Sequence, residues 1–393
     1  MCRDRAGGRL PIFCIVPPHI LTHIALGRSR ETRRLAAWAL HTLALSERVR
    51  GARAALGPIA TLAVTPAVTK RRTVYDAGHA ERLPGKLVRS EGDAPVRDPS
   101  VNEAYDGAGD TYDFYLEAYG RNSIDDRGMG LDSSVHYGRE FDNAFWDGRQ
   151  MVYGDGDGTI FGRFTKCIEI IGHELTHGVT EYEARLDYRD QPGALNESFS
   201  DVFGSLVKQK KLGQDAAAAD WLIGAGLFAP GVKGVALRSM KAPGTAYNDP
   251  RIGKDPQPAH MKDFVSTHED NGGVHINSGI PNHAFYLAAT AIGGRAWAKA
   301  GRVWYLALRD RLRPDAQFAD AARETAALAV ELFGAGGREA RAVAAAWDEV
   351  GVAGTAAGRR TGAYAHRVRA VGRVRRHQPA ARRRKRRAPR RRA

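Results

Sequence analysis

Apolar residues recur at helical spacing in two consecutive stretches of the chain. Each stretch places an apolar residue at every third or fourth position, which is the period of a helix that packs one face against a core. These positions are Ile168, Ile171, Leu175 and Val179 in the first stretch and Leu195, Phe199, Val202 and Leu206 in the second. The pattern predicts two amphipathic helices.

The pattern differs on either side of these two helices. Residues from about 59 to 160 form short runs rich in β-branched and aromatic residues, and Asp147-Gly148 is a hairpin turn signal between two of them. The runs are 59–65, 111–120, 133–138 and 143–158. We therefore expect an antiparallel, strand-rich N-terminal lobe. The motif YGDGDG at 153–158 has the spacing of neither a phosphate loop nor a calcium loop and is interpreted as a turn.

From residue 277 onward, four segments show helical period between Ser, Asp, Gly or Pro boundaries. This predicts an α-helical C-terminal lobe and an α+β fold. An active site is expected at the junction of the two lobes, where clefts commonly form.

Polar residues of the first predicted helix are candidates for metal chemistry. His173 and His177 are four residues apart, so they share one helix face and can bind one metal ion. Glu174 projects beside that ion without ligating it, as the general base of a zinc hydrolase must. Two histidines with ordinary hydrogen bonds are the alternative that this short motif leaves open.

The second predicted helix offers carboxylates that complete such a site. Glu197 and Asp201 lie on one face of it, one turn apart. Catalytic zinc needs three protein ligands and one position for water, and Glu197 has the reach of the third ligand. Asp201 suits an acceptor for the second ring nitrogen of a zinc-bound histidine. A solvated acidic face is the alternative, but the neighbouring residues are apolar or small.

Composition and charge narrow the class of protein. A chain of 393 residues with 43% apolar residues and no long apolar run fits globular lobes without a membrane span. Cys2, Cys14 and Cys167 provide no disulfide framework. Residues 353–393 hold sixteen Arg or Lys and no acidic residue, which leaves 43 basic and 44 acidic residues elsewhere. This tail therefore accounts for the net charge of +15; we expect it to be disordered and able to contact polyanions non-specifically.

Four motifs together resemble the thermolysin family of zinc endopeptidases. HELTH at 173–177, GALNESFSD at 193–201, ALRSM at 236–240 and EDNGGVHINSG at 269–279 follow the family's order within residues 65–352. The resemblance implies the family's two-lobe fold, with the zinc site between the lobes. It also implies one catalytic zinc, held by His173, His177 and Glu197, with Glu174 as the base that activates its water.

The resemblance also implies roles for residues outside the zinc ligands. His275 and Tyr188 match the family's donors to the oxyanion, and Asp270 matches the acid that orients His275. Arg238 matches the arginine that binds a substrate carbonyl, for which a guanidinium is well suited.

Further matches concern the substrate itself. Asn143 and Ala144 match the strand edge that pairs with the substrate backbone, and Leu237 and Ile170 match the apolar pocket beyond the cleaved bond. The resemblance therefore implies cleavage before bulky apolar residues.

The chain departs from thermolysin at the paired calcium site. Thermolysin uses five carboxylates there, and the matching positions hold the carboxylates Glu169 and Asp220 but also Lys208, Leu222 and Ala225. Because calcium needs several oxygen ligands, we expect the paired calcium site to be absent.

The N-terminal segment LPIFCIVPPHIL, at 10–21, is apolar but is not a standard signal peptide. Pro17 and Pro18 interrupt it, and helical patterning follows. A Pro-Pro-aromatic motif followed by Ile-Leu resembles the precursors of the protealysin-like branch of the family, with His19 in place of the usual Tyr.

This resemblance implies that the N-terminal segment is a proregion that covers the active site as an intramolecular inhibitor. We expect the enzyme to remove it within RVRGARAALG at 48–57, which is polar and loop-like enough to be cut, so that the mature chain begins between about residues 48 and 62. Cys14 could cap the zinc as a thiolate, although a buried apolar cysteine is the commoner role. The expected domains are the proregion at 1–52, the strand-rich lobe at 53–180, the helical lobe at 181–352 and the basic tail at 353–393.

The sequence thus favours the precursor of a zinc endopeptidase that acts on proteins or peptides. We expect a secreted monomer, with a cytoplasmic location as the alternative. Two other functions remain open: a catalytically silent protein that binds polyanions through its tail, and a peptidase that trims chain ends. No terminus-binding motif supports the last of these.

Overall fold

The computed structural model describes residues 13–27, 32–56 and 68–352. All of these belong to one compact unit, Met1–Ala356. No helix in this part of the chain is long and apolar enough to cross a membrane. Cys2 and the basic tail fall outside the described residues, as does the predicted strand run at 59–65.

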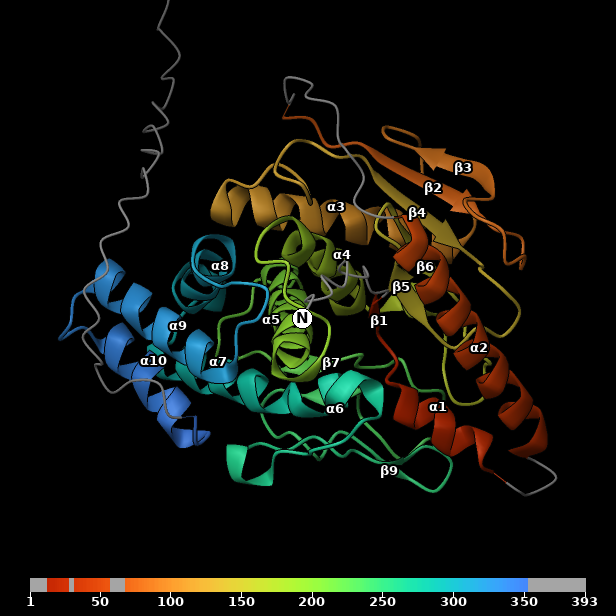
Figure 1. The fold of residues 1–393 in the computed structure, drawn as a ribbon. Helices are drawn as coiled ribbons and strands as arrows, with labels where there is room; N and C mark the ends of the chain where they lie inside the picture. Colours follow the sequence, from red (N-terminus) through yellow and green to blue (C-terminus); the bar gives the residue numbers. More distant parts are fainter. Residues whose placement is uncertain (1–12, 28–31, 57–67, 353–393) are drawn as a thin grey trace, which may run out of the picture. The chain divides into compact units, whose positions relative to one another are not determined.

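The N-terminal part of the fold contains a six-stranded sheet (Figure 1). In spatial order its strands are β1 (Phe13–Cys14), β5 (Ala144–Trp146), β6 (Gln150–Tyr153), β4 (Leu131–Val135), β2 (Arg72–Asp76) and β3 (Lys86–Ser90). The β5-β6 pair is antiparallel around Asp147 and Gly148, which confirms the predicted hairpin. However, β2, β4 and β6 run parallel to one another, so the prediction of an antiparallel lobe is wrong there. Parallel neighbours need a long crossover, and helix α3 provides it between β3 and β4.

Helix α3 (Pro99–Tyr119) corrects a second prediction, because it contains most of the run 111–120 that we expected to be a strand. Its first turn is capped by the Asp98 side chain, which accepts a hydrogen bond from the backbone N–H of Ser100 (2.8 Å). Gly120, with a left-handed φ of 73°, ends the helix. The aromatic residues of the run fill the buried face of a helix, so their β-propensity was outweighed by capping and packing.

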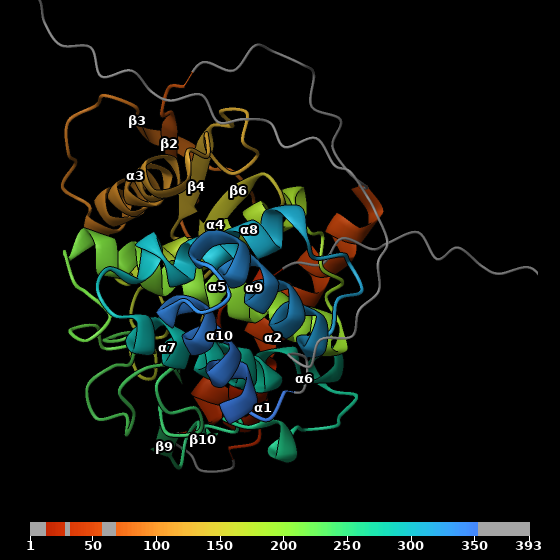
Figure 2. The ribbon, with the colours of Figure 1, turned by 90° about the vertical axis from the view of Figure 1, so that its left-hand side faces the viewer.

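Helices α4 (Ile168–Tyr182) and α5 (Asp190–Lys211) confirm the two amphipathic helices. They lie between the sheet and the C-terminal helices (Figures 1 and 2). The two helices approach closely where Gly172 faces Gly204. A Cβ atom on Gly204 would lie 2.4 Å from the carbonyl oxygen of Glu169, closer than real Cβ atoms come. Because glycine has no side chain, the two helices come close enough here for His173 and His177 of α4 to meet Glu197 of α5.

The predicted helical lobe is also confirmed. Its helices are α6 (Asp270–Asn277), α7 (Gly279–Ile292), α8 (Ala300–Asp310), α9 (Phe318–Phe333) and α10 (Arg338–Glu349). The short elements are η1 (Phe164–Lys166), β7 (Leu222–Ile223), β8 (Arg238–Ser239), β9 (Asn248–Asp249), β10 (Gly253–Lys254), η2 (Met261–Asp263) and η3 (Ala296–Ala298).

The N-terminal segment packs onto this body through β1 and two helices, α1 (Pro18–Ala25) and α2 (Thr32–Leu56). Ile20 and Ile24 are buried in the main core, and Leu45 of α2 packs in a smaller cluster with Tyr137 and Phe145. Helix α2 continues to Leu56, so the loop-like interpretation of 48–57 is wrong for residues 48–56. Arg, Ala and Leu are strong helix formers, which accounts for the extension.

Candidate metal centre and substrate cleft

Three potential metal ligands meet where α4 crosses α5. The ligand atoms of His173, His177 and Glu197 all lie within 4.8 Å of one another. The two Nε2 atoms are 3.0 Å apart, and each lies 3.5 Å from an oxygen of Glu197. All three side chains are at most 1% exposed, and Glu197 Oε2 has no hydrogen-bond partner among the described residues. A buried carboxylate oxygen and two converging ring nitrogens fit a zinc ion.

Other side chains fix the orientation of both imidazoles. His173 Nδ1 lies 2.8 Å from Asp201 Oδ1, as predicted for Asp201. His177 Nδ1 lies 2.8 Å from Asn196 Oδ1 and 3.0 Å from Ser200 Oγ. Both Nε2 atoms are thereby turned toward Glu197. Asn196 and Ser200 were not predicted from the sequence, although Asn196 directly precedes Glu197 and Ser200 follows it by three residues on the same helix.

Burial and neighbouring charges set the ionisation of this centre. Burial lowers the pKa of His177 to about 3, so its imidazole is neutral, as a metal ligand must be. Burial alone would raise the pKa of Glu197, but His275, His177 and His173 hold it well below its ordinary value.

Glu174 lies beside these ligands and is fully buried. Its Oε2 accepts a hydrogen bond from the backbone N–H of Trp146 (3.1 Å), while Oε1 has no hydrogen-bond partner among the described residues. Burial, together with the charge of Glu197, raises the pKa of Glu174 well above its ordinary value. The carboxylate is therefore poised to accept a proton.

His275, Tyr188 and Asp270 form one hydrogen-bonded group next to Glu197. His275 Nδ1 donates to Asp270 Oδ1 (2.7 Å), and Tyr188 Oη lies 3.3 Å from His275 Nε2. The Tyr188 hydroxyl also donates to Glu197. Burial lowers the pKa of His275, but Asp270 and Glu197 outweigh this and raise it above the ordinary value.

Arg238 reaches the centre from β8. Its Nε and Nη2 atoms each donate to a carboxylate oxygen of Asp201 at 2.8 Å. Asn282, which was not predicted from the sequence, also donates to Asp201 (2.8 Å). Asp201 thus binds His173 and Arg238 at the same time. Burial raises the pKa of Asp201, but the ion pair with Arg238 and the hydrogen bond with His173 outweigh this effect and lower the pKa to about 2.

Residues 14–16 of the N-terminal segment cross this centre and bind it through their backbone. The N–H of Ile15 donates to the carbonyl of Ala144 (3.2 Å), and the N–H of Val16 donates to Asn143 Oδ1 (3.0 Å). Nη1 of Arg238 donates to the carbonyl of Ile15 (3.0 Å). The carbonyl of Cys14 accepts a hydrogen bond from His275 Nε2 (3.0 Å).

The side chains of residues 14–16 are buried. Ile15, Ile170 and Leu237 are at most 1% exposed and belong to the same hydrophobic cluster. The Cys14 side chain instead packs in the smaller cluster with Leu45 and Phe145. This is the buried apolar role and not that of a zinc cap.

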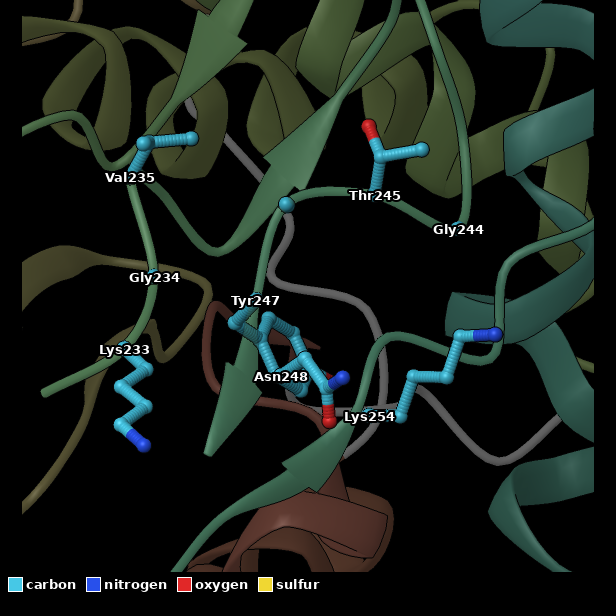
Figure 3. A pocket seen from close by; sticks show the side chains of 9 residues that line it. Lys233, Gly234, Val235, Gly244, Thr245, Tyr247, Asn248 and Lys254 are labelled. Carbon is cyan, nitrogen blue, oxygen red and sulfur yellow. The ribbon is translucent and has the colours of Figure 1, made fainter. Parts of the chain in front are cut away.

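A separate surface hollow of about 430 Å³ surrounds Tyr247 (Figure 3). Lys233 and Lys254 stand on either side of Tyr247 and Asn248 in this view. None of the predicted catalytic or zinc-binding residues lines it, so the hollow does not mark the catalytic centre.

Comparison with known proteins identifies the family. Residues 65–181 match the family model of the thermolysin metallopeptidase catalytic domain, and residues 184–352 match that of its alpha-helical domain. An extracellular metalloprotease of Pectobacterium carotovorum subsp. carotovorum is 50% identical over 346 residues, which cover 87% of this chain and 97% of that protein. Protease PrtS of Photorhabdus sp. (strain Az29) is 52% identical over 287 residues, covering 72% of this chain and 77% of that protein.

A solved structure supports the same relationship. The precursor of protealysin, a metalloproteinase from Serratia proteamaculans, is 54% identical and superposes with a TM-score of 0.78, covering 87% of this chain and all of that one. These matches confirm the α+β fold with its helical C-terminal domain, and none of them supports a polyanion-binding protein without catalysis. The chain belongs to the thermolysin family of zinc-dependent metallopeptidases.

Proposed function

We propose that this metallopeptidase holds its zinc with His173, His177 and Glu197 and uses Glu174 as the general base. Bound zinc supplies a Lewis acid that polarises a peptide carbonyl and lowers the pKa of a water molecule. Glu174 accepts the proton of that water and passes it to the departing amine. Its burial and its raised pKa support this role, because they make the carboxylate a stronger base than an exposed glutamate.

The single observation that carries the proposal is the way in which the centre holds the backbone of Cys14–Val16. The carbonyl of Cys14 lies at His275, and the following N–H and carbonyl of Ile15 bind Ala144 and Arg238. We infer that a substrate binds in the same register. Its scissile carbonyl then receives hydrogen bonds from His275 and Tyr188, which stabilise the oxyanion as it forms.

This register also supports the proposed specificity. Ile15 stands where the residue after the cleaved bond would stand, and it shares a buried apolar cluster with Ile170 and Leu237. Burying a Leu, Ile or Phe side chain there contributes about 1.5–3 kcal/mol relative to leaving it exposed. The enzyme therefore cleaves before bulky apolar residues.

A pair of variants tests these roles. Glu174→Ala should retain about one zinc per chain but lose about 10²–10⁴-fold in peptidase activity, whereas Glu197→Ala should lose the zinc. Zinc is measured by mass spectrometry, and activity with peptides that differ only in having Leu or Asp after the scissile bond. Full activity in Glu174→Ala, or equal cleavage of both peptides, would refute the assignments.

The N-terminal segment acts, in this proposal, as a proregion that inhibits the enzyme by filling the substrate cleft. Its backbone takes the four hydrogen bonds that a substrate would use at Ala144, Asn143, Arg238 and His275. Removal of residues 1 to about 52 would open the cleft. N-terminal sequencing should show that the active enzyme begins between about residues 48 and 62, and that Glu174→Ala keeps Met1. An active enzyme that retains Met1 would contradict the inhibitory role.

The paired calcium site is proposed to be absent, because Lys208 takes the position of a cation there. Its Nζ lies 2.8 Å from Asp220 Oδ2 and 3.3 Å from the buried Glu169 Oε1. Glu169 also accepts hydrogen bonds from the backbone N–H groups of Gly224 and Ala225. An ammonium and two N–H donors satisfy the carboxylates that would otherwise attract calcium.

We further propose that the enzyme acts outside the cell, because the relatives above include a protease named extracellular. We also propose that it acts as a monomer. Residues 53–180 and 181–352 form its two catalytic lobes in this proposal. The basic tail at 353–393 adds only a non-specific contact with polyanions. Fractionation of the culture medium tests the location, and light scattering tests the monomer. Heparin chromatography of the full chain beside a chain ending at Val352 tests the contact made by the tail.

A further inference from the structure

A second cluster of potential metal ligands lies outside the catalytic centre. Among residues 13–27, 32–56 and 68–352, His79, His136 and Asp155 form a group whose ligand atoms lie within 4.8 Å of one another. None of the three has a role in the catalytic assignment.

The topology of the sheet brings these residues together. Strands β2, β4 and β6 are adjacent and parallel, and each of the three residues follows the carboxyl end of one of them. His79 comes three residues after β2, His136 directly after β4, and Asp155 two residues after β6. The carboxyl ends of parallel strands meet at one edge of a sheet, where ligands commonly bind.

The backbone holds both histidines in an uncommon conformation. His79 has a φ of 62° and His136 a φ of 54°, in the left-handed region that few non-glycine residues adopt. The N–H of His79 donates to the carbonyl of His136 (2.8 Å), which keeps the two residues together. The backbone therefore holds the two residues next to each other.

Distances between the potential ligand atoms suit a small cation. His136 Nδ1 lies 2.9 Å from both carboxylate oxygens of Asp155, and His79 Nδ1 lies 3.5 Å from Asp155 Oδ2. A tetrahedral zinc ion holds ligand atoms about 3.3 Å apart. Small movements of side chains that are 54%, 18% and 30% exposed would admit the ion, with water as a fourth ligand.

A fourth side chain orients His136. Its Nε2 lies 2.7 Å from Asp98 Oδ2, while Asp98 Oδ1 caps helix α3 and so fixes the carboxylate. A carboxylate behind a ligating imidazole is the usual support of a zinc-bound histidine. The guanidinium of Arg163 interacts electrostatically with both aspartates and would repel a bound cation, but it is paired with Glu103 (2.6 Å).

We propose that His79, His136 and Asp155 form a second zinc site on the surface, with Asp98 positioning His136. Two imidazoles and one carboxylate favour zinc and neighbouring transition metals over calcium or magnesium, which prefer oxygen ligands. A cation at this point would tie the turn after β2 to the ends of β4 and β6. The site is independent of the catalytic assignments above.

The test counts zinc in the full-length chain carrying Glu174→Ala, after dialysis against a zinc buffer. About two zinc ions per chain are expected in this background and about one after adding His79→Ala or Asp155→Ala. The matched control, His268→Ala, removes another exposed histidine and should keep two. Cobalt substitution gives a second readout, since His79→Ala should lose the absorption of one of two bound Co²⁺ ions.

The outcome distinguishes a metal site from a plain hydrogen-bonded cluster. One zinc in the Glu174→Ala chain, or two that persist in both His79→Ala and Asp155→Ala, would overturn the proposal. The Glu174→Ala/Glu197→Ala chain should keep about one zinc, at the proposed second site, and should lose it when His79→Ala is added. This result does not depend on whether the catalytic assignment is right.

Discussion

Acidic pH should release the proregion, because the partly buried His19 packs against the catalytic body in its neutral form. His19 Nε2 lies 2.9 Å from the hydroxyl of Tyr247, and its Nδ1 is buried without a hydrogen-bond partner among the described residues. Burial lowers the pKa of His19 from 6.5 to about 4. Asp270 opposes this effect, while the charges of His275, Arg238 and His23 add to it.

The sign and size of the effect follow from proton linkage. A released proregion would expose His19, whose pKa would return to about 6.5. Between pH 6.5 and 4 the released state therefore binds more protons than the docked state, so docking weakens as the pH falls. Between pH 7.5 and pH 5 the loss is about 2 kcal/mol, or about 30-fold in the docking equilibrium.

Hydrogen exchange measures this equilibrium directly. We would compare the Glu174→Ala precursor with Glu174→Ala/His19→Tyr at both pH values and correct for intrinsic exchange rates. Protection of residues 14–25 should fall about 30-fold at pH 5 in the first protein. It should fall much less in the second, because tyrosine does not titrate in this range. Equal losses in both proteins would show that other groups control release.

Three further perturbations have defined outcomes. Lys208→Met should lower the free energy of unfolding by about 3 kcal/mol, because it leaves Glu169 buried without its countercharge; denaturant titration measures this. The melting temperature of the unmodified chain, kept in zinc buffer, should be the same with and without added calcium, and a rise of many degrees with calcium would contradict the proposed absence of that site. Asp201→Asn should weaken zinc binding or activity about 10–100-fold, since it weakens the support of His173 and the ion pair with Arg238. Zinc competition with a chelator and kcat/KM separate these two effects.

The sequence was most informative where one helix carries several functional residues. Spacing correctly predicted helices α4 and α5, and helical geometry alone places His173 and His177 on one face of α4. Glu197 of α5 meets them as predicted, but that prediction needed the ligand count of zinc as well as the spacing. It did not predict Asn282, which reaches Asp201 from α7, 81 residues away. Contacts of this kind depend on tertiary packing that no local pattern encodes.

Local composition misled the prediction where packing or capping decides the structure. The aromatic run at 111–120 looked like a strand, but the cap at Asp98 and the buried face of α3 make it helical. Strand direction was also beyond the sequence. Strands β2 and β4 can run parallel because the chain crosses over through α3 between them. Since part of α3 was predicted to be a strand, the sequence did not indicate this crossover.

The arrangement around Asp201 explains why substrate binding and metal binding are expected to be coupled. One oxygen of its carboxylate lies 2.8 Å from His173 and from Arg238 Nη2, and the other accepts from Arg238 Nε and Asn282. Arg238 in turn donates to the carbonyl of Ile15. A single buried carboxylate therefore positions both a proposed zinc ligand and the guanidinium that binds the backbone after the scissile bond. Because a buried ion pair is costly to break from one side, Arg238 stays aimed at the cleft when the proregion leaves, and the cleft is ready for a substrate without rearrangement.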